Sequence, residues 1–227
     1  MKLILFDVDG TLLTCGPQVR PIFVAALEEV YGCRPDLAGY SFAGKTDPRI
    51  VCDLVTGTGL PEGEVIARLP AMRESYVGRL ERRLDVARMV LLPGVVELLD
   101  RLSAIPGLTL GLLTGNWQRG AEVKLGRFDL GRYFEFGAYG DDGVARSDLP
   151  PVALERAAAH AGRPFTADEV LIVGDTTEDV ACAAAHRVAC LAVATGFTPA
   201  ERLRQAGARW VVEDLPSAAE VWAACGG

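Results

Sequence analysis

Residues Leu3 to Leu13 read LILFDVDGTLL, and this stretch decides the fold. An unbroken apolar run such as KLILF at 2–6 is typical of a parallel strand that is buried on both faces. The run ends in Asp7 and Asp9, and Gly10 then permits a tight turn. Spacing i, i+2 at a strand end predicts that both carboxylates lie on one face. Because two such close carboxylates repel, we expect a cation or a proton nearby.

Apolar runs of the same kind recur along the chain and alternate with amphipathic segments. The further predicted strands are 108–114, 134–139, 169–175, 188–195 and 208–215. The predicted helices between and after them are 117–128, 150–161, 177–186, 199–206 and 216–224. This alternation predicts an α/β fold with a doubly wound, Rossmann-like and mostly parallel sheet.

The alternation is interrupted once. Between Thr14 and Met89 no convincing strand occurs, and three segments there have helical patterns: PIFVAALEEVYG, DPRIVCDLVTGTG and EGEVIARLPAMRESYVGRLERRL. We therefore expect a helical insertion between the first strand and the rest of the sheet.

A phosphate-binding pattern lies inside this insertion. Gly39 to Thr46 read GYSFAGKT, which fits the P-loop pattern G-x-x-x-x-G-K-[ST]. A P-loop requires a buried strand directly before it, whereas YGCRPDLA precedes Gly39 and carries Pro35 and Asp36. Thr46 is suited to cap a helix and Pro48 to its first turn. A loop between two helices is the favoured interpretation, and a P-loop NTPase, with VLIVGD as its acidic strand, stays an alternative.

Composition restricts the partners. The chain has 227 residues and a net charge of −7, and no basic block suggests a nucleic-acid partner. No apolar stretch approaches the roughly 18 residues of a membrane span. The cysteines form no C-x-x-C pair and are expected to be reduced thiols in a cytoplasmic protein. They stand at 15, 33, 52, 182, 190 and 225.

Polar side chains end three of the predicted strands. Asp7 and Asp9 end the first, Thr114 the second in LLTGN, and Asp175 a later one in IVGDTTED, with Asp179 one helical turn beyond. Ligands of open parallel sheets bind beyond the carboxyl ends of the strands, so these residues are expected to converge on one crevice. Oxygen ligands of this kind suit Mg²⁺.

This series of motifs resembles the haloacid dehalogenase-like (HAD) superfamily. The likeness rests on DVDGT, a strand ending in Thr114, and GDTTED, and it covers essentially the whole chain. The helical insertion is similar to the type 1 cap of that superfamily, and the closest general likeness is to phosphoglycolate-phosphatase-like members. The resemblance implies an α/β catalytic core at 1–14 and 87–227 and a helical cap domain at 15–86.

The resemblance also implies catalytic roles. Asp7 would be the nucleophile, and Asp9 the general acid and then the general base. Mg²⁺ would bind the Asp7 carboxylate, the Asp9 backbone carbonyl and Asp175, while Asp179 would hold the metal's waters or its ligands. The expected phosphate-binding residues are Gly10, Thr114, Gly115, Asn116 and Arg146.

Arg146 marks a departure from the family pattern. The family has a basic residue, usually lysine, before the helix that precedes the last acidic strand. The only lysines here are Lys2, Lys45 and Lys124, and none lies in that segment, whereas Arg146 does. A guanidinium can hold a phosphate oxygen, although it differs from an ammonium in reach and geometry. A solvated loop arginine is the plainer alternative.

The expected activity is hydrolysis of a small organic phosphate monoester, phosphoglycolate-like or a sugar phosphate, by a monomer or homodimer without a nucleic-acid or membrane partner. In the cap, Lys45 and Arg49 are candidates to meet an anionic group of the substrate, with surface cations as the plainer reading. His160 and His186 receive no role. A phosphomutase is the main alternative, followed by a phosphonatase or dehalogenase. Outside these classes stand a phospho-receiver module and a non-catalytic phosphate-binding module.

Overall fold

A six-stranded sheet is the centre of the computed structural model, which describes residues 1–196 and 198–226. The strands are all parallel, and their order is β5-β4-β1-β6-β7-β8. Their bounds are Leu3–Phe6 (β1), Thr109–Leu113 (β4), Gly137–Ala138 (β5), Val170–Gly174 (β6), Ala189–Val193 (β7) and Trp210–Val212 (β8). Each lies within a predicted run, so the predicted doubly wound sheet is confirmed.

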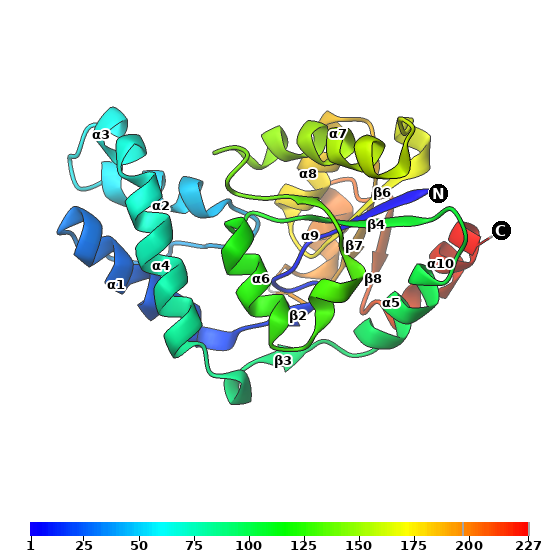
Figure 1. Cartoon of the computed structure of the whole chain (residues 1–227), viewed down its shortest axis with the longest axis horizontal. Helices are drawn as coiled ribbons and strands as arrows, with labels where there is room; N and C mark the ends of the chain where they lie inside the picture. Colours follow the sequence, from blue (N-terminus) through cyan, green and yellow to red (C-terminus); the bar gives the residue numbers. More distant parts are fainter. Residues whose placement is uncertain (197, 227) are drawn as a thin grey trace.

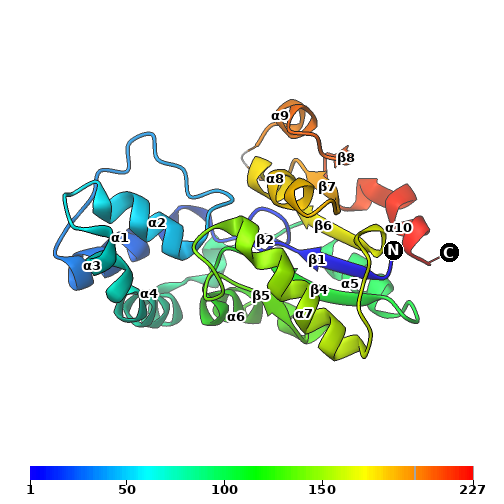
Figure 2. The ribbon, with the colours of Figure 1, turned by 90° about the horizontal axis from the view of Figure 1, so that it is seen from above.

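Helices cover both faces of the sheet (Figures 1 and 2). Alternate residues of β1 show why: Leu3 and Leu5 face one apolar cluster, and Ile4 and Phe6 face the other. The first cluster is completed by α7 (Leu149–Ala161), α8 (Thr177–Ala185) and α9 (Ala200–Gln205). The second is completed by α5 (Val95–Ser103), α6 (Gln118–Gly126) and α10 (Ala219–Gly226). Burial on both faces accounts for the absence of polar alternation in the strands.

The strand order reverses at β1. From β1 the chain builds outward through β4 to β5, and later through β6 to β8 on the other side. Such a reversal opens a crevice beyond the carboxyl ends of the central strands. The residues that follow β1, β4 and β6 are therefore the ones placed to form a site.

The predicted helical insertion lies beside the sheet, at the left of Figure 1. Its helices are α1 (Val19–Tyr31), α2 (Asp47–Thr56), α3 (Glu62–Ala67) and α4 (Leu69–Arg83). The chain enters it after β2 (Leu13–Thr14) and leaves it before β3 (Val90–Leu91), and these two strands pair antiparallel. The exact division into 15–86 and the remainder stays a prediction.

The two chain crossings are also joined by a side chain. Gln18 is buried. Its amide nitrogen Nε2 donates to the carbonyl of Asp85 at 3.1 Å, and its Oε1 accepts from the backbone N–H of Asp85 at 2.9 Å. These reciprocal bonds fix the start of the insertion to its end.

The P-loop-like segment has the predicted loop structure. Thr46 caps α2 by accepting from the N–H of Arg49, and Pro48 lies in the first turn. The described residues 32–46, which precede α2, contain no strand. The context that a P-loop needs is therefore missing here. In the part of the chain that the structure describes, no helix is long and apolar enough to cross a membrane.

Candidate active site

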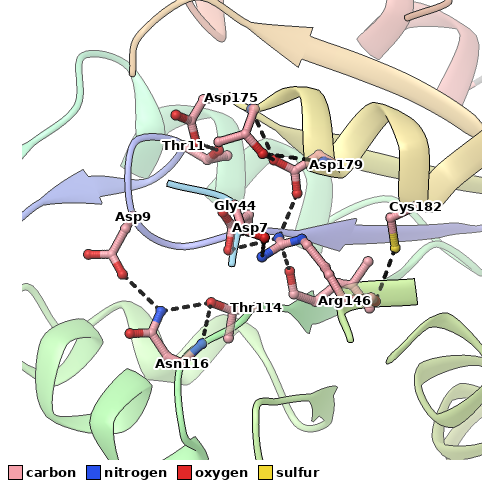
Figure 3. A network of polar contacts seen from close by, with 12 residues as sticks. Asp7, Asp9, Thr11, Gly44, Thr114, Asn116, Arg146, Asp175, Asp179 and Cys182 are labelled. Atoms are coloured by element: carbon pink, nitrogen blue, oxygen red, sulfur yellow. Dashed lines mark hydrogen bonds and ion pairs between the residues drawn. The ribbon is translucent and has the colours of Figure 1, made fainter. Parts of the chain in front are cut away.

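Two polar networks flank the carboxyl end of β1 (Figure 3). The first, on the β6 side, is called here the carboxylate cluster and consists of Asp7, Asp175 and Asp179. The second, on the β4 side, is called the Asp9 network. Its members are Asp9, Thr114, Asn116 and Lys124.

The carboxylate cluster is buried and tightly spaced. One oxygen from each of Asp7, Asp175 and Asp179 lies within 4.8 Å of the others. The backbone N–H of Asp7 donates to Val173 at 2.9 Å, which ties the end of β1 to β6. Asp179 accepts from the backbone N–H and the hydroxyl of Thr176 at 3.0 and 2.6 Å, in the capping box of α8. The structure thus brings together three of the predicted site residues.

Arg146 is the cation of this cluster. Its Nη2 lies 3.2 Å from Asp7 Oδ1 and 2.5 Å from Asp179 Oδ1, and it donates to the Leu113 carbonyl at 3.1 Å. The side chain is buried, so the alternative of a solvated loop arginine does not describe its position. Its Nε has no hydrogen-bond partner among the described residues. A buried, partly unsatisfied guanidinium beside Asp7 is suited to hold an anion.

Negative charge is in excess in the carboxylate cluster. Burial raises the pKa of Asp7 to about 6, with Arg146 acting in the opposite direction and Asp179 adding to the rise. Burial also raises the pKa of Asp175 to about 8, and the neighbouring carboxylates of Asp179 and Asp7 contribute. One guanidinium does not balance three carboxylates. Because the donors are all carboxylate oxygens, the cluster fits a divalent cation such as Mg²⁺.

Gly10 keeps this cluster open. Its φ of +88° is in the region that favours glycine, and a Cβ built there would lie 2.4 Å from Asp175 Oδ2. Its carbonyl accepts from the hydroxyl of Thr195 at 2.6 Å. The residue predicted to bind phosphate is therefore required for the position of Asp175, whereas its contact with phosphate stays a prediction.

Asp9 differs from the prediction that it shares one face with Asp7. Its carboxylate points away from the carboxylate cluster, toward Asn116 (Figure 3), and accepts from Asn116 Nδ2 at 2.8 Å. That prediction was wrong because β1 ends at Phe6, and the chain after it turns toward Gly10. The alternation of a strand therefore does not set the direction of Asp9.

Lys124 is a site residue that the sequence analysis missed. Its Nζ lies 2.5 Å from Asp9 Oδ2 and 2.5 Å from Asn116 Oδ1, and its side chain is 3% exposed. It stands in α6, outside the segment where the family pattern places its basic residue. A signal existed, because Ala121, Lys124 and Leu125 have the spacing of one helix face and all three are buried.

Thr114 and the residues after it follow β4, as predicted. Asn116 Nδ2 donates to Thr114 Oγ1 at 2.8 Å. Gly115 is packed against the insertion, because a Cβ built there would lie 2.2 Å from the carbonyl oxygen of Lys45. The loop before α2 therefore lies directly on the loop after β4.

Lys45 and Arg49 pair with a cap carboxylate in this structure. Lys45 Nζ lies 2.8 Å from Asp53 Oδ2, and Arg49 Nε lies 2.7 Å from Asp53 Oδ1. Lys45 also lies over the ring of Tyr40, at 4.1 Å from its centroid. The structure does not bring either cation to the carboxylate cluster, and contact with a substrate anion stays a prediction for both.

The cysteines and histidines supply no side chain to either network, although Cys182 Sγ donates to the backbone carbonyl of Arg146 at 3.3 Å (Figure 3). Among the described side chains, the cysteines at 15, 33, 52, 182 and 190 are free thiols, and Cys225 lies outside them. His160 contacts Glu135, and His186 lies 2.9 Å from the carbonyl of Ser147. Neither histidine contacts the two networks.

The model of the haloacid dehalogenase-like hydrolases matches residues 1–187, and this chain belongs to that family. Among curated relatives, phosphoglycolate phosphatase of Pseudomonas syringae pv. syringae is 30% identical, over 94% of this chain and 77% of the relative. Phosphoglycolate phosphatase of Synechococcus elongatus is 28% identical, over 94% and 93%. The family expected from the motifs is confirmed, and so is the expectation of a phosphatase.

Solved structures agree on the fold. A hydrolase from Pseudomonas syringae has a TM-score of 0.71 at 22% identity and covers 100% of both chains. A predicted phosphoglycolate phosphatase from Haemophilus somnus has a TM-score of 0.69 at 21% identity and covers 97% of both. At these identities the likeness concerns the α/β fold with its helical insertion.

Proposed function

We propose that this chain is a Mg²⁺-dependent phosphatase that hydrolyses a small organic phosphate monoester through a phosphorylated Asp7. The observation that carries this proposal is the buried carboxylate cluster beside Arg146, at the carboxyl end of the central strand. A strand-end carboxylate next to both a cation site and a guanidinium suits phosphoryl transfer, which depends mainly on positioning and charge stabilisation.

In the first half of the reaction, an Asp7 carboxylate oxygen attacks the phosphorus. The bond between phosphorus and the ester oxygen breaks, and the leaving alcohol takes a proton from Asp9. In the second half, a water molecule attacks the same phosphorus while Asp9 takes its proton. The bond to Asp7 then breaks, which releases inorganic phosphate and restores the Asp7 carboxylate, while Asp9 is again protonated.

Fixed donors hold the phosphoryl oxygens during both halves. Arg146 lies 3.2 Å from Asp7, so its guanidinium is placed to neutralise charge next to the nucleophile. Thr114 would donate its hydroxyl to another phosphoryl oxygen. Mg²⁺ bound by Asp7, the Asp9 carbonyl and Asp175 would supply further charge stabilisation. Asp179 would hold the waters or the protein ligands of the metal.

A small substrate fits the way the insertion covers the crevice. Lys45 lies against Gly115, and a Cβ at Gly44 would lie 2.6 Å from Thr176 Oγ1. The loop 44–47 thus passes over the residues that follow both β4 and β6. Together with relatives named phosphoglycolate phosphatases, this supports a small carboxylated phosphate ester as the substrate, and segment 15–86 as the cap that admits it.

The test is phosphate release by the purified chain with Mg²⁺ from p-nitrophenyl phosphate and from a panel that includes phosphoglycolate and sugar phosphates. We expect turnover that chelation by EDTA abolishes and that Asp7→Asn lowers by at least about 10⁴-fold. Hydrolysis that persists in Asp7→Asn at saturating Mg²⁺ would show that another group is the nucleophile. Interconversion of sugar phosphates that requires a bisphosphate would instead identify a phosphomutase.

A further inference from the structure

The Asp9 network contains a buried ammonium to which neither the family pattern nor the proposed reaction assigns a task. Lys124 Nζ is shared between Asp9 Oδ2 and Asn116 Oδ1, both at 2.5 Å. Its side chain is 3% exposed, whereas that of Asp9 is 39% exposed. A lysine is rarely buried unless it is paired, so its position is held by these two oxygens.

The hydrogen bonds around Asn116 have a fixed direction. An ammonium only donates, so the atom of Asn116 that faces Lys124 is the amide oxygen. The amide nitrogen must then face the other way, where it donates to Asp9 Oδ2 and Thr114 Oγ1, both at 2.8 Å. The Asp9 carboxylate only accepts and so favours the same orientation, which means that Lys124 and Asp9 together fix the amide, one at each end.

The direction of these bonds also determines what Thr114 can donate. Its Oγ1 accepts from Asn116 Nδ2 at 2.8 Å and, at 3.4 Å, from the Asn116 backbone N–H. Among the described residues, no acceptor receives the hydroxyl hydrogen of Thr114. That hydrogen is therefore available to a ligand oxygen, as a phosphate-binding threonine requires.

We propose that Lys124 is a positioning residue, which sets the orientation of the Asp9 carboxylate directly and that of the Thr114 hydroxyl through Asn116. This inference rests on the proposed function, since it assigns Asp9 to proton transfer and Thr114 to phosphate. Lys124 would thus support both proton transfer by Asp9 and phosphate binding by Thr114, although it binds neither the substrate nor Mg²⁺ itself.

The kinetic test uses two substrates that differ in their leaving group. An alkyl phosphate such as glycerol phosphate releases a strongly basic alkoxide and depends on a well-placed acid, whereas p-nitrophenyl phosphate releases a stable phenolate. We expect Lys124→Met to lower kcat/KM for the alkyl ester at least about tenfold more than for the aryl ester, and Lys124→Arg to restore part of it. Lys2→Met, an exposed lysine at the other end of β1, is the matched control.

A structural arm keeps the inference testable apart from activity. In a crystal structure of Lys124→Met, we expect the Asp9 carboxylate to leave Asn116 or the Asn116 amide to turn over. Retention of both contacts, an equal loss for the two esters, or a gain for the alkyl ester would overturn the inference. If the wild-type enzyme hydrolyses neither ester, the proposed function fails, while the crystal structure still decides the positioning role.

Discussion

The two networks at the carboxyl end of β1 differ in charge balance. The carboxylate cluster sets three acids against the single guanidinium of Arg146, whereas the Asp9 network sets one acid against one ammonium and fills its remaining bonds with an amide and a hydroxyl. The first network has an excess of carboxylates, which a bound cation or protons would balance. In the second, the ammonium of Lys124 balances the carboxylate of Asp9, and their hydrogen bonds through Asn116 hold the geometry before a ligand binds.

This difference separates two kinds of task in one crevice. An unbalanced cluster can bind a cation and an anionic phosphate, while a balanced network can hold a proton-transferring group in place. Substitutions in the two networks should accordingly have effects of different kinds.

After Asp7→Asn, the largest effect is expected at Arg146. Arg146→Ala removes the guanidinium beside Asp7 and should lower kcat/KM by about 10²- to 10³-fold, measured by phosphate release. Since it also leaves Asp179 without its buried partner, about 3–5 kcal/mol of stability should be lost, so Arg146→Lys is the milder companion variant. The control is Arg132→Ala, at an exposed arginine that contacts Asp129. A loss no greater than in Arg132→Ala would end the catalytic role of Arg146.

The next effect separates the networks by their metal dependence. Asp175→Asn removes a carboxylate from the cluster and should raise the Mg²⁺ concentration for half-maximal activity at least about tenfold. Asp9→Asn should lower turnover while leaving that concentration within about twofold, because only the backbone carbonyl of Asp9 is assigned to the metal. Equal shifts in both variants would contradict the separation of tasks.

A third effect concerns stability and pH. The raised pKa values of Asp7 and Asp175 mean that the folded state holds protons that the unfolded state releases. The stability of the metal-free protein should therefore fall as pH rises from about 4 to about 8. Burial raises the pKa of Asp47 to about 7, and this residue adds to the same trend.

Thermal unfolding measures this trend. We expect the metal-free midpoint to drop by several degrees over that range, since about 1 kcal/mol corresponds to about 2–4 °C in a chain of this size. Mg²⁺ should raise the midpoint more at pH 8 than at pH 5, because it binds the ionised carboxylates. Metal-free Asp175→Asn should show a flatter profile than the wild-type protein. A midpoint that rises between pH 5 and 8 without metal would disprove the assigned charge excess.

The smallest effect is expected outside both networks, in the insertion. If Lys45 exchanges Asp53 for a substrate carboxylate, Lys45→Met should raise KM for phosphoglycolate by about fivefold, the size of a partly exposed ion pair. KM for p-nitrophenyl phosphate, which has no such group, should not change. The exposed Arg34, replaced by alanine, serves as the control. Similar KM changes for both substrates would argue against a contact with the carboxylate.

The sequence predicted the carboxylate cluster better than the Asp9 network. Asp7 and Asp175 directly follow buried apolar runs, and the strand order of a doubly wound sheet brings such positions together. Arg146 was found from its place in the chain. The direction of the Asp9 side chain could not be predicted, because Asp9 lies in the turn that leads into Gly10 and not in a strand.

Lys124 shows the limit of pattern reading. A lysine within a helix is usually solvated, and only the packing of α6 under Asp9 explains its burial. The one sign of this burial in the sequence was that Lys124 has the spacing of one helix face with the apolar residues Ala121 and Leu125. The fold was predictable because each strand is marked by a local apolar run in the sequence. A polar network, in contrast, depends on residues that meet only after folding.

The short ladder between β2 and β3 has an evolutionary consequence. Entry to and exit from the helical insertion are adjacent in this ladder, and the bonds between Gln18 and Asp85 join them again. The insertion is therefore a closed loop with respect to the sheet. The entropic cost of closing such a loop rises only slowly with its length. An insertion of another length could therefore be joined at the same two neighbouring points without separating β1 from the strands that follow it.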